Sequence, residues 1–117
     1  MSDSVTIYHN PRCSKSRQTL ELLESEGVIP TIVKYLETPP DAATLGSLLD
    51  MLGLQPRQLM RTAEAEYSTL QLDNPALTRE QLIQAMAEHP RLIERPIVVK
   101  DGRAVLGRPP EKVLDLL

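Results

Sequence analysis

The sequence predicts an α/β fold, in which a four-stranded mixed sheet carries a three-helix insert between a strand–helix–strand half and a strand–strand–helix half. Three observations favour this fold. Short β-branched runs lie near both ends of the chain, apolar residues at helical spacing lie between them, and Asp101-Gly102 marks a hairpin. We expect one domain over residues 1–117, with the insert at about 41–90.

The first half begins with a strand at Val5. Asn10-Pro11 ends this strand, because proline has no N–H to donate to a sheet. Leucines at helical spacing predict a helix over residues 14–27, with Gly27 in the left-handed position after its end. The run 31–36 predicts a second strand, and a strand–helix–strand unit implies that its strands are parallel.

The insert is expected to hold three helices. The first begins after Asp41 and places apolar residues on one face, namely Leu45, Leu48, Leu49 and Leu52. The second covers about residues 56–65 and puts Arg57 and Arg61 on one face. Residues 66–76 are predicted to be irregular. The third helix opens with the capping box Thr78-Arg79-Glu80-Gln81.

The second half is an antiparallel pair, Ile97–Lys100 and Arg103–Leu106, followed by a helix over residues 108–117. This helix is expected to bury three side chains, those of Val113, Leu114 and Leu117. Without the insert the order is βαβ then ββα, which is the layout of the thioredoxin fold. That layout implies a sheet with helices on both faces.

Composition excludes several classes of protein. The net charge of −3 and the three aromatic residues argue against nucleic-acid binding. One cysteine cannot form an internal disulfide, which fits a reducing compartment. No signal peptide or membrane span is apparent, so we expect a cytoplasmic protein. One cysteine and two histidines suggest no metal site, and we expect no bound cofactor.

Cys13 lies between the end of the first predicted strand and the start of the helix that follows it. Unpaired N–H groups and the helix dipole favour a thiolate there, and Arg12, Lys15 and Arg17 add positive charge. The same N–H groups can hold a tetrahedral anion. The expected substrate is therefore an oxyanion attacked by sulfur, or a disulfide. A lone cysteine can also be a small buried hydrophobe, but its polar neighbours favour the reactive interpretation.

Five stretches, taken together, resemble the ArsC family of arsenate reductases, the kind coupled to glutathione and glutaredoxin. They are Thr6-Ile7-Tyr8-His9-Asn10-Pro11-Arg12-Cys13, Tyr35-Leu36-Glu37-Thr38-Pro39-Pro40, Leu59-Met60-Arg61, Glu94-Arg95-Pro96-Ile97-Val98-Val99 and Gly107-Arg108-Pro109-Pro110-Glu111. Their order follows the chain from end to end, so the resemblance covers the whole predicted domain. One departure is Arg12, because better-known members have a small residue before the cysteine.

The resemblance implies a role for each of several residues. Cys13 corresponds to the nucleophile that attacks arsenate, and His9 to a histidine that helps to set its reactivity. Three arginines correspond to those that hold the oxyanion, namely Arg61, Arg95 and Arg108. Pro96 corresponds to a proline that usually follows a cis bond. Three polar residues around the cysteine are expected to contact the substrate as well, namely Asn10, Ser14 and Ser16.

The implied cycle needs an external thiol. Ser16 stands where a dithiol motif would place a second cysteine, so Cys13 has no resolving partner in the chain. Glutathione would attack the cysteine–arsenic adduct and release arsenite, and a glutaredoxin would then remove the glutathione.

Other interpretations remain open at this point. A thiol-linked reductase of another substrate, or an Spx-like regulator that binds RNA polymerase, would share the fold. The regulators typically carry a paired-cysteine switch, which Ser16 removes here. A low-molecular-weight phosphatase is disfavoured, because Thr19 stands where its arginine is required. Arg61 can instead be a helix charge paired with Glu64 or Glu66.

Overall fold

The computed structural model describes residues 4–117, which divide into two compact units. The first unit runs to Thr38 and resumes at Arg95–Leu117, and the second is Pro39–Glu94. The predicted insert, at about 41–90, falls within the second unit. The assignment of residues 1–117 to one domain stays a prediction.

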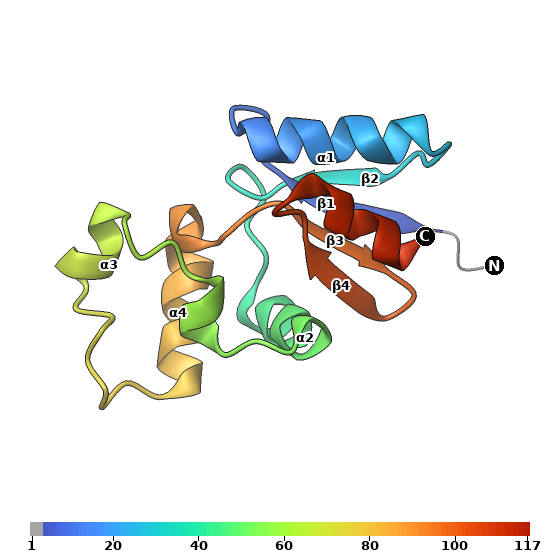
Figure 1. Ribbon diagram of the computed structural model, residues 1–117. Coiled ribbons are helices and arrows are strands. Elements are labelled where there is room, and N and C mark those ends of the chain that lie inside the picture. Colours follow the sequence, from blue (N-terminus) through green and yellow to red (C-terminus); the bar gives the residue numbers. More distant parts are fainter. Residues whose placement is uncertain (1–3) are drawn as a thin grey trace. The chain divides into compact units, whose positions relative to one another are not determined.

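The first unit is built on a four-stranded mixed sheet with strand order β2-β1-β3-β4 (Figure 1). The strands are β1 Val5–His9, β2 Thr31–Lys34, β3 Ile97–Lys100 and β4 Arg103–Leu106. β1 is parallel to β2 and antiparallel to β3, and β3 is antiparallel to β4. The predicted four-stranded mixed sheet, thioredoxin-like in its order of elements, is confirmed.

Because of these strand directions, four connecting segments meet at one edge of the sheet. β1, β2 and β4 all end at this edge, and β3 begins there. The segments that leave or enter the sheet at the same edge carry Cys13, Glu37, Arg95 and Arg108. We call it the Cys13 edge.

The helix after Cys13, α1 (Ser14–Ser25), ends two residues before the predicted boundary. Gly27 follows its end with φ 79°, as predicted. The N–H of Gly27 donates to the carbonyl of Glu24, and the N–H of Val28 donates to that of Leu23, each at 3.0 Å. These two hydrogen bonds form a Schellman motif, which satisfies the last carbonyls of the helix.

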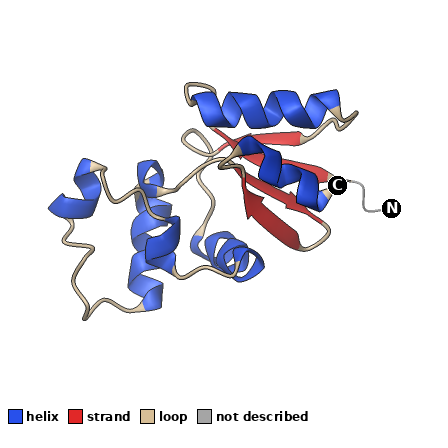
Figure 2. Ribbon diagram, viewed as in Figure 1, coloured by secondary structure: helices blue, strands red, loops and turns tan. Residues whose placement is uncertain are grey.

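One face of the sheet carries α1 and the C-terminal 3₁₀-helix η3 (Pro110–Leu116), which pack side by side (Figure 2). The hydrophobic cluster beneath them consists of Val5, Ile7, Leu23, Val98, Val113 and Leu116. α1 also buries the polar side chains of Ser16 and Thr19. Alternate residues of β1 are buried, because successive side chains of a strand point to opposite faces. The expected cover of the opposite face stays a prediction.

The buried face of the last helix differs from the prediction. The helix is 3₁₀ rather than α, so its side chains repeat every three residues, and the buried ones are Pro110, Val113 and Leu116. Leu114 and Leu117 were expected to face inward but are 41% and 43% exposed. The prediction is confirmed for Val113 and was wrong for Leu114 and Leu117, because it applied an α-helical spacing.

The second strand is shorter than predicted. β2 ends at Lys34, whose carbonyl accepts the N–H groups of Glu37 and Thr38, each at 2.9 Å. This turn takes the place of the predicted strand residues 35 and 36. The predicted hairpin is confirmed, and both Asp101 and Gly102 have positive φ, as a two-residue type I′ turn requires.

The second unit is helical, with α2 (Ala42–Leu52), α3 (Ala65–Thr69), α4 (Arg79–Glu88) and two 3₁₀ turns, η1 (Pro56–Leu59) and η2 (Pro90–Leu92). Asp41 caps α2 by accepting the N–H of Thr44 at 2.8 Å, and Thr78 and Gln81 form the predicted capping box of α4. No helix within residues 4–117 is long and apolar enough to cross a membrane.

The helix predicted over residues 56–65 does not form. η1 ends at Leu59, and Met60 pairs with Ile93 in an antiparallel bridge. The flanking hydrogen bonds, Glu94 N–H to Leu59 carbonyl and Arg61 N–H to Leu92 carbonyl, hold the chain extended there. Long-range pairing thus overrides local helical spacing. Arg57 and Arg61 do not share a helix face, and α3 occupies part of a stretch that was predicted to be irregular.

Candidate active site

Cys13 is the residue that caps the N-terminus of α1. Its backbone is extended, its N–H donates to the carbonyl of Asn10, and its carbonyl accepts the N–H of Arg17, both at 3.0 Å. The side chain is half-buried rather than enclosed. A thiol in this position faces the unpaired N–H groups of the first helical turn.

Burial raises the pKa of the Cys13 thiol, but the backbone N–H of Ser16, the Arg95 guanidinium and the backbone N–H of Lys15 together hold that pKa below its ordinary value. The predicted direction is confirmed. The cation that lowers this pKa is Arg95, which is distant in the sequence and lies just before β3 at the Cys13 edge. Arg17, expected to contribute, donates instead to the carbonyl of Pro11 at 2.9 Å.

A buried hydrogen-bonded group lies directly behind the cysteine. The Ser16 hydroxyl oxygen is 2.6 Å from Nδ1 of His9 and accepts the N–H of Asn10 at 3.0 Å. Burial lowers the pKa of His9, and the charges of Lys34 and Arg17 lower it further. The arrangement therefore fits a neutral imidazole that accepts the Ser16 hydroxyl hydrogen at Nδ1.

The side chain of Asn10 shapes the loop before the cysteine. Its Oδ1 accepts the N–H of Arg12 at 3.0 Å, which is an Asx turn. Ser14 is the exposed first residue of α1. The expected substrate contacts of Asn10, Ser14 and Ser16 stay predictions.

Two arginines of the first unit lie at the Cys13 edge. Arg95 interacts with the Cys13 thiol, and Nη1 of Arg108 donates to the Arg95 carbonyl at 3.2 Å. The bond between Arg95 and Pro96 is cis, as the resemblance implies, and the bond between Arg108 and Pro109 is cis as well. The structure thus brings together Cys13 and two of the three predicted arginines.

Gly107 lies at a close approach beside these arginines. A β-carbon there would lie 2.5 Å from Oγ1 of Thr19 and 2.9 Å from Cγ of Pro96. The N–H of Gly107 also donates to the Pro96 carbonyl at 2.9 Å. Gly107 was expected only as part of a family stretch and had no predicted role of its own, although a glycine just after a strand is a signal of close backbone approach.

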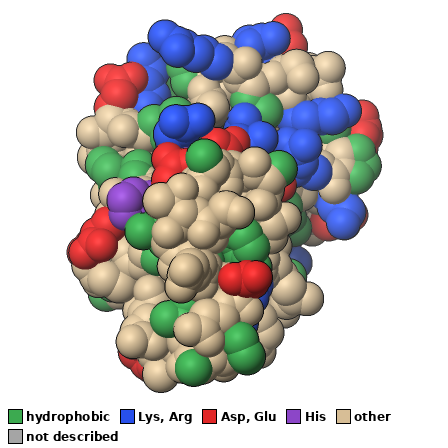
Figure 3. Space-filling view, turned by 90° about the vertical axis from the view of Figure 1, so that its left-hand side faces the viewer, with side chains coloured by type: hydrophobic (Ala, Val, Ile, Leu, Met, Phe, Trp, Pro, Cys, Tyr) green, Lys and Arg blue, Asp and Glu red, His purple; other side chains and the backbone are tan. Residues whose placement is uncertain are grey.

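Arg61 belongs to the second unit, where carboxylates surround it. Its Nη1 lies 2.8 Å from Oε2 of Glu64, and its Nε lies 3.7 Å from Oε1 of Glu94. Arg91 also pairs with Glu64, at 3.1 Å. On the face that Figure 3 shows, basic and acidic side chains lie next to one another. The 2.8 Å contact is the predicted ion pair between Arg61 and Glu64. An oxyanion role for Arg61 stays a prediction.

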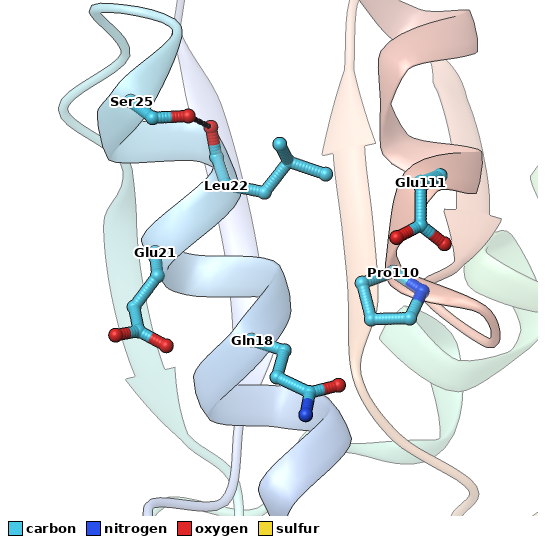
Figure 4. Close-up of a pocket in the computed structure, with 6 residues that line it drawn as sticks. All are labelled: Gln18, Glu21, Leu22, Ser25, Pro110 and Glu111. Atoms are coloured by element: carbon cyan, nitrogen blue, oxygen red, sulfur yellow. Dashed lines mark hydrogen bonds between the residues drawn. The ribbon is translucent and has the colours of Figure 1, made fainter.

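The hollows formed by the described residues include two on the first unit. One is an open groove between α1 and η3, lined by Gln18, Glu21, Leu22, Ser25, Pro110 and Glu111 (Figure 4). It contains two carboxylates and none of the predicted site residues. The other is formed by residues 9–12 with Lys34, Leu36 and Glu37, beside the Cys13 loop. No group of three or more metal-ligating side chains gathers within residues 4–117.

His89, for which the sequence indicated only a helix end, caps the C-terminus of α4. Its N–H donates to the carbonyl of Ala85 at 2.8 Å.

Comparisons with known proteins cover nearly the whole chain. A model of the ArsC family matches residues 8–116. The chain is 57% identical to uncharacterized protein YfgD of Escherichia coli K12, over 100% of this chain and 99% of that protein. It is 50% identical to the arsenate reductase of Haemophilus influenzae, over 97% of this chain and 99% of that protein.

A solved structure agrees with these comparisons. An arsenate reductase from Vibrio cholerae matches with a TM-score of 0.97 and 53% identity, and the match covers 100% of both chains. The range that the family model matches contains Cys13 and all three predicted arginines.

Proposed function

Because the chain belongs to the ArsC family, we propose that it reduces arsenate to arsenite, with Cys13 as the nucleophile, glutathione as co-substrate and glutaredoxin as the partner that regenerates the thiol. The observation that carries this proposal is the pairing of Cys13 with Arg95 at the start of α1. A thiolate and a guanidinium in contact can attack and neutralise an oxyanion at the same place.

The arginines address the charge problem of the reaction. Arsenate is an anion, so it repels a thiolate unless cations hold it. Arg95 and Arg108 lie together at the Cys13 edge and can offer forked N–H donors to arsenate oxygens. We assign Arg61 to the same task, in which arsenate would compete with Glu64 and Glu94 for its guanidinium.

The proposed chemistry balances in three steps. The Cys13 thiolate attacks arsenic and displaces an oxygen, which leaves as water after protonation. A glutathione thiolate then attacks the Cys13 sulfur, a disulfide forms, and the sulfur–arsenic bond breaks with its electron pair remaining on arsenic, which leaves as arsenite. A glutaredoxin thiolate finally attacks the glutathione sulfur and releases the Cys13 thiolate.

His9 and Ser16 are assigned a positioning role behind the thiol. Their 2.6 Å hydrogen bond, with the Asn10 N–H on the same oxygen, fixes the first turn of α1. The Ser16 N–H that lowers the Cys13 pKa belongs to this turn. His9 therefore acts on the thiol indirectly, by fixing the position of the N–H donors that face the sulfur.

The test is arsenate-dependent oxidation of NADPH in an assay coupled through glutathione, glutaredoxin and glutathione reductase, with arsenite measured directly. We expect activity that Cys13→Ser abolishes. Arg95→Ala and Arg108→Ala should each lower kcat/KM by at least about tenfold, since one charge-assisted hydrogen bond contributes about 1.5–3 kcal/mol.

Lys112→Ala is the matched control, because Lys112 is an exposed cation of the first unit on η3. It should retain wild-type kinetics. Absence of arsenite production by the wild-type protein, with Cys13 still reactive toward alkylating agents, would reject arsenate as the substrate and keep the nucleophile.

A further inference from the structure

A pocket beside the loop that leads to Cys13 contains none of the three arginines assigned to the oxyanion. It has a volume of about 220 Å³ and is formed by residues 9–12, from the loop after β1, and by Lys34, Leu36 and Glu37 at the end of β2. His9 lines it and is only 5% exposed, so the pocket reaches the buried group behind the thiol.

Three charged side chains surround this pocket, namely Arg12, Lys34 and Glu37. Within residues 4–117, none of their side chains makes an ion pair or a hydrogen bond. Two cations and one carboxylate around a hollow are complementary to an α-amino acid group, which carries a carboxylate and an ammonium. Because the volume is below the about 300–1,000 Å³ that encloses a drug-sized ligand, the pocket fits one end of an extended molecule.

The strand order places this pocket opposite the arginines. β1 is flanked by β2 on one side and by β3 on the other. At the Cys13 edge, Lys34 and Glu37 therefore belong to the β2 side, whereas Arg95 precedes β3 and Arg108 follows β4. An oxyanion held by these two arginines and a molecule in the pocket would approach Cys13 from opposite sides.

This arrangement suits the second proposed step. A thiolate that attacks a sulfur approaches in line with the bond that breaks, so it comes from the side opposite the leaving group. With arsenic held on the Arg95 side, a thiol that approaches from the β2 side, where the pocket lies, meets this in-line requirement.

We propose that the pocket formed by residues 9–12, Lys34, Leu36 and Glu37 binds the α-amino acid end of a peptide thiol, with the carboxylate on Lys34 and Arg12 and the ammonium on Glu37. The inference rests on the proposed function for the thiol's role and names where that co-substrate binds. A γ-glutamyl thiol such as glutathione has this end group.

The test measures disulfide exchange at Cys13 without arsenate. The Cys13 thiolate attacks one sulfur of glutathione disulfide, the sulfur–sulfur bond breaks, and one glutathione thiolate leaves with the electron pair. Mass spectrometry of the intact protein follows the mixed disulfide. The rate constant for the same exchange with uncharged 2-hydroxyethyl disulfide measures the intrinsic reactivity of the thiol. The rate constant with glutathione disulfide divided by this one therefore isolates recognition of the charged end.

We expect Lys34→Gln and Glu37→Gln each to lower this ratio about fivefold, the size of one exposed charge pair. The two variants separate recognition from net charge. Glutathione disulfide is an anion, so a general charge effect would make Glu37→Gln react faster, whereas loss of an ammonium contact makes it react more slowly. Lys112→Gln, with the same charge change on η3, should leave the ratio unchanged.

An unchanged ratio in both pocket variants, an increased ratio in Glu37→Gln, or an equal loss in Lys112→Gln would each overturn the inference. Because no arsenate is present, a failure of arsenate reduction does not affect this result. An active arsenate reductase with an unchanged ratio would refute the pocket assignment alone.

Discussion

At the scale of single residues, the chemistry of Cys13 depends on a few donors that come from different parts of the chain. Two are backbone N–H groups of the first helical turn, at Ser16 and Lys15, and the third is the guanidinium of Arg95. Together they outweigh the cost of burying the thiolate. The two N–H groups belong to residues close to Cys13 in the sequence. The guanidinium of Arg95 comes near Cys13 because β3 pairs with β1.

The first prediction concerns the Arg95 contribution. Arg95→Ala should raise the Cys13 pKa toward its ordinary value, because a guanidinium that stabilises the thiolate is lost. The pH profile of Cys13 alkylation by iodoacetamide measures this shift. Arg12→Ala is the matched control, since Arg12 is the sequence neighbour but the charge that lowers this pKa is that of Arg95. An equal shift in both variants would contradict the prediction.

The same shift has a consequence for stability. The Cys13 pKa is lower in the folded chain than in the unfolded one, so the ionised thiolate stabilises the fold at pH values above the unfolded thiol pKa. This contribution is lost as the pH falls through the folded-state pKa.

The second prediction tests the group behind the thiol. Ser16→Ala should destabilise the protein by about 1–3 kcal/mol, because the Asn10 N–H and His9 Nδ1 lose their shared buried partner. Urea unfolding measures the loss. Ser25→Ala is the control on the same helix, where the hydroxyl donates to the Leu22 carbonyl at an exposed position and should matter little. Similar losses in the two variants would argue against a special role for Ser16.

At the scale of elements, close packing positions the segments that carry the arginines. Gly107 lies between Thr19 of α1 and Pro96, and its N–H donates to the Pro96 carbonyl. The spacing between α1 and the loops at the Cys13 edge therefore leaves no room for a side chain at this position.

The third prediction follows from this contact. Gly107→Ala should cost about 1–3 kcal/mol of stability, the usual penalty of overpacking, and should lower activity because Pro96 and Arg108 shift. Gly46→Ala is the matched control, because a β-carbon at this position in α2 meets nothing within 4 Å. It should stabilise the protein by up to about 1 kcal/mol. Thermal unfolding distinguishes the two, and a neutral Gly107→Ala would refute the packing argument.

The fourth prediction tests the three-residue repeat of η3. Leu116→Ala should cost about 2–5 kcal/mol, because Leu116 is only 4% exposed and belongs to the core cluster. Leu114→Ala, at a 41% exposed position of the same helix, should cost far less. Chemical denaturation of both variants gives the comparison. The reverse order would indicate that the helix presents the α-helical face expected from the sequence.

At the scale of the whole molecule, the chain passes through the first unit, then the second, and returns to the first. Tyr8 and Tyr35 belong to the first unit and Tyr67 to the second. The chain contains no tryptophan, so these residues are natural probes of each unit.

The fifth prediction is that the chain unfolds as one cooperative domain. Urea unfolding followed by far-ultraviolet circular dichroism and by the resolved NMR signals of Tyr8 and Tyr67 should give coincident transitions. Leu49→Ala, a buried change in α2, should shift the midpoints of both tyrosines together. Separate midpoints for Tyr8 and Tyr67 would show that the two units unfold independently.

The sequence by itself determined the strands, the hairpin and the place of the cysteine, because these depend on local patterns. β-branched runs specify strands, and Asp101-Gly102 adopts the positive φ that its turn requires. Thr78 caps α4 together with Gln81, three residues further on. The same local rules predicted that the Cys13 pKa would be lowered by the start of a helix.

Only the tertiary structure decided where pairing with residues distant in the sequence replaces the secondary structure that local patterns predict. Met60 pairs with Ile93, so the chain leaves η1 and is extended where an α-helix was predicted. Arg95 reaches Cys13 because β3 runs antiparallel to β1, and no spacing rule along the chain encodes that contact. The strand order also separates the β2 side, with Lys34 and Glu37, from the side of the arginines. These features arise from long-range pairing, and that is the physical reason why local sequence patterns could not predict them; the role of Arg95 was expected only from the family resemblance.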